Sequence, residues 1–212
     1  MLRIVAMLLF VCTTSFHVAH AQDAAVAGTV QQLQGAALVN RTDSSANLGK
    51  GSQLQVGDRI VTGRNARIVL RMIDGSTLTL GENTEFAINE YRYSARAKQG
   101  SAHFELIKGV FRAITGAIGK LPARDFTVST TNATIGIRGT DFWGGFLFSN
   151  GLDVALLGGG GVYIENAAGR VEISRVGYGT TVMAAGQAPS APIRWGDKKL
   201  AAAMQSVTLR QD

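Results

Sequence analysis

The sequence predicts an all-β fold, and three observations support this. Asp74-Gly75 and Asn150-Gly151 each separate two apolar runs, and such pairs are the turn sequences most typical of tight β-hairpins. Leu78 and Leu80 alternate with threonines, which predicts a strand with one buried face and one wet face. Turn signals recur roughly every 8 to 12 residues, as in sandwiches and barrels. The 26 glycines therefore fit many tight turns better than disorder.

Runs of strand character follow one another along the chain, separated by glycine and other turn residues. In order they are GTVQQLQGAALVN (28–40), GDRIVTG (57–63), ARIVLRMIDGSTLTLG (66–81), EFAINEYRY (85–93), AHFELIKGVFRAITG (102–116), DFTVSTTNATIGIRGT (125–140), FWGGFLFSNGLDVALLGGGGVYIENAAGRVEI (142–173) and YGTTVMAAG (178–186). Segments 35–51 and 160–177 share a weak strand, turn and strand pattern, which would suit stacked repeats. We therefore expect either a Gly-rich sandwich of short strands or a solenoid-like β domain.

The N-terminus has the layout of a secretory signal peptide, residues 1–21. Arg3 precedes an apolar run, Ile4 to Val11, that is too short to span a bilayer, and Ala19-His20-Ala21 is a typical cleavage triplet. We expect cleavage after Ala21 and export to the periplasm or the extracellular space. No later segment approaches the length of a transmembrane helix, so we expect no transmembrane segment in the mature chain.

The chemical inventory of a mature chain argues against most enzymes. Cleavage would remove the single cysteine and two of the three histidines, leaving His103 in a strand-like context. One histidine supplies neither a Cys/His zinc site nor, in that context, a convincing Ser-His-Asp triad. Asp58, Asp74 and Asp153 each lie beside glycine or a turn, where an aspartate commonly binds the backbone. We predict no catalytic residue, no metal and no cofactor.

A carboxylate-based hydrolase stays as an alternative. Glu85, Glu90, Asp141 or Asp153 could supply an acid and a base from different strands, but nothing in their spacing selects a pair.

The charge of the mature chain does not indicate a nucleic-acid partner. Without Arg3 it carries 20 Lys and Arg against 15 Asp and Glu. The excess is dispersed, whereas nucleic-acid binders concentrate positive charge on one face. The densest basic stretch is YRYSARAK (91–98).

The composition changes in the C-terminal extension, residues 186–212. Two prolines, Pro189 and Pro192, interrupt strand formation. Asp197 could cap a short helix whose stripe would contain Leu200, Met204 and Val207. We expect this helix to cover the edge or end of a sheet, with partner binding as the alternative.

The segment GIRGTDF combines strand-forming residues with two glycines. Gly136 and Gly139 would allow a sharp bend or a close backbone approach, and Arg138 between them could reach across it. We favour Arg138 as a buried structural lock, with a ligand contact as the alternative, because a guanidinium offers five donors in a fixed fork.

Four aromatic residues follow this segment directly. If the strand is regular, Phe142, Phe146 and Phe148 share one face and Trp143 points the other way. Trp143 would then be an outward residue, so we name Arg138 and Trp143 as candidate binding residues.

Residues 54–88 together with FELIKGVFRAITG and FTVSTTNATIGIRGTDF resemble the FecR-type domain of iron-dicitrate transport regulators. The motifs that match are Gly57-Asp58 before a strand ending in Thr62-Gly63, Asp74-Gly75-Ser76, Lys108-Gly109 and Gly136-Ile137-Arg138-Gly139-Thr140. The resemblance extends from about Val26 to about Val182, and it predicts a FecR-type β domain over 22–185. Regulatory members of that family combine a cytoplasmic anti-sigma segment, one membrane helix and an extracytoplasmic β domain. Here a cleavable leader stands in place of the first two, which indicates a stand-alone secreted member.

The resemblance implies a non-enzymatic binding, sensing or scaffolding module of the cell envelope, with a protein or an envelope component as its partner. A secreted glycan-binding or envelope-structural domain is the alternative.

Overall fold

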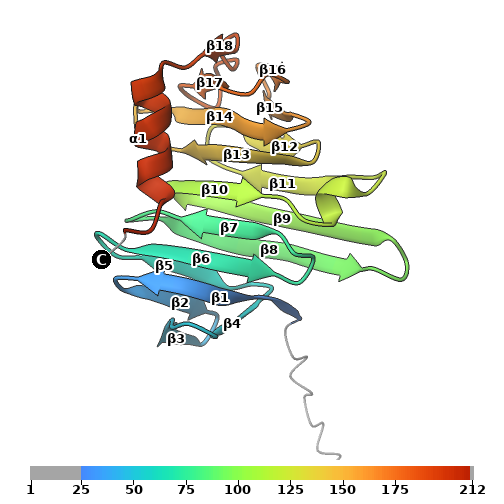
Figure 1. The fold of residues 1–212 in the computed structure, drawn as a ribbon, viewed down its shortest axis with the longest axis vertical. Helices are drawn as coiled ribbons and strands as arrows, with labels where there is room; N and C mark the ends of the chain where they lie inside the picture. Colours follow the sequence, from blue (N-terminus) through green and yellow to red (C-terminus); the bar gives the residue numbers. More distant parts are fainter. Residues whose placement is uncertain (1–24, 211–212) are drawn as a thin grey trace, which may run out of the picture.

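The computed structural model describes residues 25–210 and arranges them mainly as two open β-sheets of nine strands each (Figure 1). In spatial order, sheet A contains β18 (Ile193–Arg194), β17 (Tyr178–Val182), β14 (Leu152–Gly159), β13 (Thr140–Gly145), β10 (Val110–Ile114), β7 (Thr77–Leu80), β6 (Arg67–Met72), β1 (Val26–Gln34) and β4 (Gln53–Gln55). Sheet B contains β16 (Gly169–Ile173), β15 (Val162–Asn166), β12 (Thr134–Ile137), β11 (Asp125–Ser129), β9 (Gln99–Lys108), β8 (Glu85–Ser94), β5 (Arg59–Thr62), β2 (Ala37–Arg41) and β3 (Ser44–Asn47). The all-β prediction is confirmed.

The chain moves back and forth between the sheets as it advances along the long axis. From β6 onward it places β6 and β7 in sheet A, β8 and β9 in sheet B, β10 in sheet A, β11 and β12 in sheet B, and so on to β18. Figure 1 shows this as a colour gradient from blue at one end to red at the other. The fold therefore combines both sequence-based expectations, because it is a two-sheet sandwich with a solenoid-like progression.

Strand pairing within the described residues is antiparallel except between β9 and β11, which run parallel. The Asp74-Gly75 pair forms the β6–β7 turn, and Asn150-Gly151 lies in the β13–β14 connection, so both hairpin predictions are confirmed. Leu78 and Leu80 are fully buried between half-buried threonines, as the alternation predicts.

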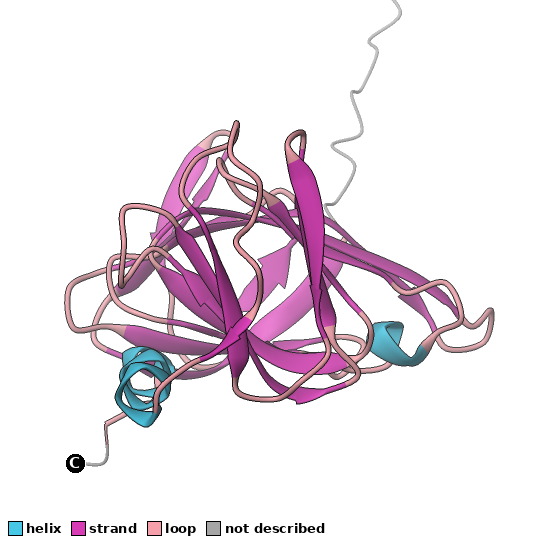
Figure 2. Ribbon diagram, turned by 90° about the horizontal axis from the view of Figure 1, so that it is seen from above, coloured by secondary structure: helices cyan, strands magenta, loops and turns pink. Residues whose placement is uncertain are grey.

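The main core lies between the two sheets. Aromatic rings run through it from Phe126 by way of Phe104 and Phe86 to Phe111 and Phe142, each centroid 5.4 or 5.5 Å from the next. Figure 2 shows the layers along the long axis, with the C-terminal helix outside the sheets.

Glycine makes the crossings between sheets sterically feasible. Gly109, between β9 and β10, has a φ of 90°, and a Cβ there would lie 2.5 Å from the Cα of Thr84. Only a residue without a side chain fits such a crossing. The short strands and frequent crossings thus account for much of the glycine content.

The C-terminal extension packs against the β domain. Strand β18 extends sheet A beyond β17, and helix α1 (Asp197–Val207) lies across the outer face of sheet A (Figures 1 and 2). Of the three residues predicted for its apolar stripe, Leu200 and Val207 pack against sheet A. The third, Met204, is only half-buried, and Ala203 is buried more deeply than Met204. The capping prediction for Asp197 was wrong, because Gly196 occupies the N-cap position and no described side chain caps the N-terminus of the helix.

The domain boundaries at 21 and 185 stay predictions. The proposed signal peptide, 1–21, and its cleavage after Ala21 lie outside the described residues. Across residues 25–210, no helix combines the length and the apolar character that crossing a membrane requires.

Candidate functional site

The two glycines around Ile137-Arg138 have different structural causes. Gly136 on β12 pairs with Tyr163 on β15, and a Cβ at Gly136 would lie 2.0 Å from the tyrosine ring. Gly139 has a φ of 73° where the chain crosses from sheet B to sheet A, and a Cβ there would lie 2.6 Å from the carbonyl oxygen of Gly119. The bend inferred from the sequence is present at Gly139, whereas Gly136 makes room for an aromatic ring.

Arg138 is exposed on the outer surface of sheet B, so the prediction of a buried lock was wrong. Its Nη2 donates to Oε1 of Glu172 at 2.8 Å, and the two side chains are 52% and 47% exposed. Arg170 donates to the same oxygen and places its guanidinium carbon 3.9 Å from the centre of the Tyr163 ring. The proposed role of Arg138 in binding stays a prediction.

Trp143 points away from the main core, as its parity predicts, but it is fully buried. Helix α1 covers it: its Nε1 donates to Oγ of Ser206 at 3.0 Å, and its ring lies 6.0 Å from that of Trp195. The expectation of an outward contact residue is corrected, because the sequence does not reveal this cover. Phe148 is a second correction: β13 ends at Gly145, and Phe148 packs against Trp143 instead of sharing the face of Phe142.

Asp74 is a buried carboxylate that holds three segments together. It accepts hydrogen bonds from the backbone and hydroxyl of Ser76, the hydroxyl of Tyr91 and the backbone N–H of Ile118. These bonds join the β6–β7 turn to sheet B and to the 3-10 turn η1 (Ile118–Lys120). The predicted backbone-binding role of Asp74 is confirmed.

Two further buried aspartates are also structural. Asp58 accepts both Nε and Nη2 of Arg41, at 2.7 and 3.1 Å, and the backbone N–H of Gln55. Asp153 differs from the prediction because it binds the side chains of Ser149, Thr181 and Lys199 rather than the backbone around it.

The carboxylates proposed for a hydrolase each form an ion pair with a nearby cation. The pairs are Glu85 with Arg59 and Lys108, Glu90 with Arg92, Asp141 with Arg112, and Asp153 with Lys199. In the Arg112–Asp141 pair, the hydrogen bonds that Arg112 donates to Asp141 raise the pKa of Arg112. The hydrogen bond from Arg59 lowers the pKa of Glu85, which is unfavourable for a general acid.

His103 lies between two carboxylates on the outer surface of sheet B. Its Nε2 is 2.7 Å from Oδ1 of Asp125, and its Nδ1 is 3.5 Å from Oε2 of Glu90. Ser101 donates to Glu90 rather than to His103, so within the described part of the chain no nucleophile is hydrogen-bonded to the imidazole. The hydrogen bond from Ser101, followed by that from Arg92, lowers the pKa of Glu90.

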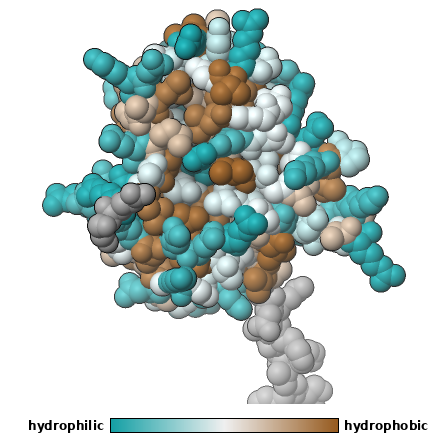
Figure 3. Space-filling view, viewed as in Figure 1, coloured by the Kyte–Doolittle hydropathy of each residue, from teal (hydrophilic) through white to brown (hydrophobic). Residues whose placement is uncertain are grey.

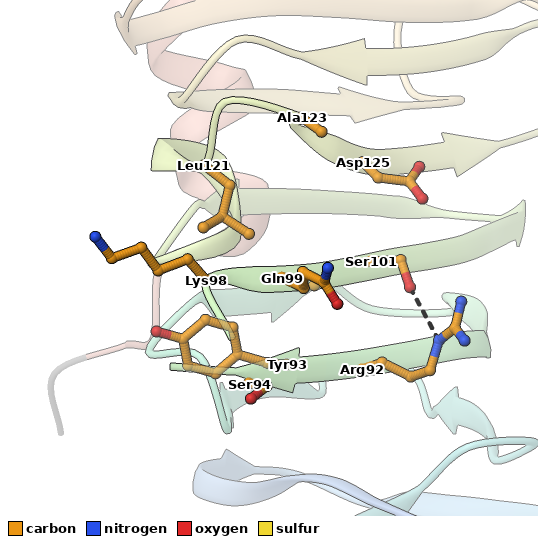
Figure 4. Close-up of a pocket in the computed structure, with 10 residues that line it drawn as sticks. Arg92, Tyr93, Ser94, Lys98, Gln99, Ser101, Leu121, Ala123 and Asp125 are labelled. Carbon is orange, nitrogen blue, oxygen red and sulfur yellow. Dashed lines mark hydrogen bonds between the residues drawn. The ribbon is translucent and has the colours of Figure 1, made fainter. Parts of the chain in front are cut away.

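A depression of about 450 Å³ opens beside this cluster, between the outer end of the β8–β9 hairpin and the segment after η1 (Figure 4). We call it the hairpin pocket. It is lined by Arg92, Tyr93, Ser94, Lys98, Gln99, Gly100, Ser101, Leu121, Ala123 and Asp125. In Figure 3 the projecting part of the molecule at the right, where this hairpin lies, carries mainly hydrophilic side chains.

Lys98 lines the hairpin pocket, and three further cations, Arg96, Lys120 and Arg124, lie within two residues of lining residues in the sequence. Arg96 and Lys98 come from the hairpin turn, and Lys120 and Arg124 from the segment after β10; all four are exposed. None of the four forms an ion pair with another described residue. The basic stretch 91–98 was visible in the sequence. The parallel β9–β11 pairing, which brings the segment that carries Lys120 and Arg124 to the β8–β9 hairpin, has no local signal in the sequence.

Comparison with known proteins places this geometry in a family. The family described as FecR protein matches residues 58–162. Two crystal structures of a candidate anti-sigma factor from Parabacteroides distasonis have similar folds, with TM-scores of 0.53 and 0.52 at 14% and 15% identity. Each comparison covers 69% of this chain and 64% of the other, so this chain spans less than two thirds of their length. No significant match was found among the curated proteins.

An identity this low establishes a shared fold and no shared activity. The family match lies on the strands that carry the Asp74 turn, the Gly109 crossing and the GIRGT segment. Residues 58–162 therefore form a FecR domain.

Proposed function

We propose that this protein is a non-enzymatic binding and sensing module of the cell envelope, exported from the cytoplasm, whose hairpin pocket contacts an acidic surface of a protein partner. The FecR domain supports the location and the role, because in regulatory members of the family this domain is extracytoplasmic and contacts another protein.

One observation carries the choice of surface. Lys98 lines the pocket, and Arg96, Lys120 and Arg124 lie within two residues of its lining residues on the same two segments. None of these four exposed cations has an ion-pair partner among residues 25–210. Exposed cations of this kind steer an acidic partner and contribute to the rate of association. Glu90 and Asp125 offset only part of this charge, because they are fewer than the cations and Glu90 is already paired with Arg92.

The chemistry of the described residues supports binding over hydrolysis. Each of the four carboxylates considered for a hydrolase is held in an ion pair, and Asp153 is fully buried. A glycan-binding role remains the alternative, and the experiment below distinguishes it.

The test is affinity capture from envelope extracts with three forms of the mature protein: wild type, Lys98→Glu/Arg124→Glu, and the control Lys50→Glu/Lys198→Glu. The control reverses the charge of two exposed lysines that do not line the pocket. We expect wild type and control to retain the same protein at low salt, and the pocket variant to retain at least about tenfold less. Retention should weaken at about 0.5 M salt, because surface charges are screened.

Two results would contradict the proposal. Equal retention by the pocket variant would show that these cations are not the contact surface. Retention of polysaccharide in place of protein would favour the glycan-binding alternative.

A further inference from the structure

Arg67, at the start of β6, is a buried cation whose hydrogen-bonding capacity is largely unused. The residue is 7% exposed, and its Nη2 donates to the carbonyl oxygen of Gln205 at 3.2 Å. Its Nε and Nη1 have no hydrogen-bond partner among the described residues. A buried guanidinium is unfavourable unless an anion or several acceptors compensate it. Packing alone therefore does not explain an arginine at this position.

Two depressions meet at Arg67. The larger, about 760 Å³, lies at the end of helix α1 and is lined by Arg67, Leu147, Phe148, Ala202, Gln205, Ser206, Thr208, Leu209 and Arg210. We call it the helix-end pocket. The smaller, about 280 Å³, is lined by Arg67, Glu82, Asn83, Gly109, Val110, Phe146, Leu147 and Ser206. Arg67 thus stands between two spaces large enough for part of a small molecule.

The charge around Arg67 favours an anion. Among residues 25–210, those that line the helix-end pocket include a second guanidinium, Arg210, and no acidic side chain. Glu82 lines the smaller depression, but its Oε2 accepts the backbone N–H of Asn65 at 2.6 Å and it makes no ion pair with Arg67. The same pocket also has an apolar wall, which includes Leu147, 46% exposed, together with Phe148 and Leu209.

We propose that the helix-end pocket binds a small amphiphilic carboxylic acid, with the carboxylate on Arg67 and the apolar part against Leu147, Phe148 and Leu209. A guanidinium matches a carboxylate in shape and charge, and the adjoining apolar wall selects a ligand with a hydrophobic part. Nε and Nη1 are buried, so the ligand must displace the groups that cover them. We expect the end of α1, which holds Nη2 through the carbonyl oxygen of Gln205, to be the segment that moves. This site is separate from the hairpin pocket and does not depend on the function proposed above.

The protein contains its own reporter for this site. Its two tryptophans, Trp143 and Trp195, both lie under helix α1. Trp143 donates to Ser206, which lines both depressions, and Trp195 packs edge-on against Phe148 of the pocket wall. Binding that moves the last turn of α1 should change the tryptophan emission.

The first experiment titrates the full chain with four probes below their aggregation concentrations. Decanoate and N-acetyl-leucine both combine a carboxylate with an apolar part, and together they distinguish a fatty-acid source from a peptide-like one. Decanol lacks the charge, and inorganic phosphate lacks the apolar part. We expect a saturable fluorescence change with at least one of the two carboxylates, at a concentration at least about tenfold lower than for decanol or phosphate.

The second experiment assigns the binding to Arg67. Arg67→Met removes the charge and keeps an unbranched side chain. Arg67→Lys retains the charge but lacks the planar guanidinium with its several N–H donors. The matched control is Arg71→Met, on the same face of β6, where the arginine is exposed. We expect carboxylate affinity to fall at least about tenfold in Arg67→Met, to fall less in Arg67→Lys, and to stay within about twofold in the control.

The design keeps loss of fold separate from loss of binding. Circular dichroism verifies the fold of each variant. If Arg67→Met does not fold, the affinity of Arg67→Lys is compared with that of the wild type instead. The proposal is overturned if neither carboxylate binds, if decanol binds as well as decanoate, or if folded Arg67 variants keep the wild-type affinity.

Discussion

At the scale of single residues, the buried carboxylate of Asp74 shows how the fold depends on protonation. Its partner Tyr91 is almost fully buried, and this burial raises the pKa of the Tyr91 hydroxyl above its ordinary value. The hydroxyl must keep its proton in order to donate to Asp74. The Asp74–Tyr91 contact thus links the stability of the folded state to alkaline pH.

This linkage predicts that stability falls as pH rises above about 10, where an unfolded tyrosine begins to ionise. Above that pH the folded state retains a proton that the unfolded state loses, so each pH unit removes up to about 1.4 kcal/mol of unfolding free energy. Tyr91→Phe should be less stable at neutral pH but lose stability less steeply above pH 10. Urea unfolding between about pH 8 and 11 measures both slopes. Tyr93→Phe is the control, and equal slopes for wild type and Tyr91→Phe would contradict the assignment.

The two residues singled out as binding candidates should differ in their effect on stability. Trp143→Ala removes a fully buried ring and the bond to Ser206, and should lower the free energy of unfolding by about 3 to 5 kcal/mol. Arg138→Ala breaks an exposed ion pair and should cost less than about 1 kcal/mol. Thermal and urea unfolding of the two variants decide this order. A larger loss for Arg138→Ala than for Trp143→Ala would contradict this order.

The sequence predicted the direction of Trp143 correctly and its exposure wrongly, for a physical reason. Side-chain parity is a local property of a strand, whereas burial depends on what lies above that strand. The cover here comes from Ala203 and Ser206, some sixty residues further along the chain. Arg138 was expected to be buried and is exposed instead. Its ion-pair partner, Glu172, lies two strands away across sheet B, so local sequence could not identify it.

At the scale of elements, the crossing segments matter as much as the strands. Each crossing needs a backbone conformation or a close approach that a side chain would prevent. The glycines could be recognised in the sequence as sites of bends. Why glycine is needed at Gly136 and at Gly139 became clear only from their neighbours in the structure, Tyr163 and Gly119 respectively.

Alanine substitutions should separate these causes. Gly139→Ala combines a left-handed φ with a backbone clash and should cost about 2 to 4 kcal/mol. Gly136→Ala should cost about 1 to 2 kcal/mol, because the ring of Tyr163 can move at the expense of its stacking with Arg170. Gly158→Ala is the control, since the added Cβ would lie 3.6 Å from its nearest neighbour, the Cβ of Asp141. Equal unfolding midpoints for all three variants would refute this account.

At the scale of the whole molecule, the sequence predicted the strands better than their arrangement. Hairpins such as β6–β7 follow from local turn chemistry. The assignment of successive strand pairs to alternating sheets and the parallel β9–β11 pairing depend on contacts between distant segments. The hairpin pocket and the helix-end pocket both lie where such segments meet, which is why neither was predicted as a site.

Helix α1 gives the decisive test of this architecture. A chain that ends after Trp195 would expose Trp143 and would deprive the buried carboxylate of Asp153 of its ion pair with Lys199. We expect the truncated protein to lose at least about 3 kcal/mol of unfolding free energy, since apolar cover and charge compensation disappear together. Its tryptophan emission should shift to the red, and it should bind a hydrophobic dye.

The matched control for the truncation is Lys198→Ala, which changes an exposed neighbour of Lys199 and leaves the helix in place. It should unfold at the wild-type urea concentration. If the truncated chain also unfolds at that concentration and binds no dye, then residues 196–212 are a dispensable extension of the β domain. We expect an integral helix because Trp143 is fully buried beneath α1, so that removal of α1 transfers a large aromatic surface to water.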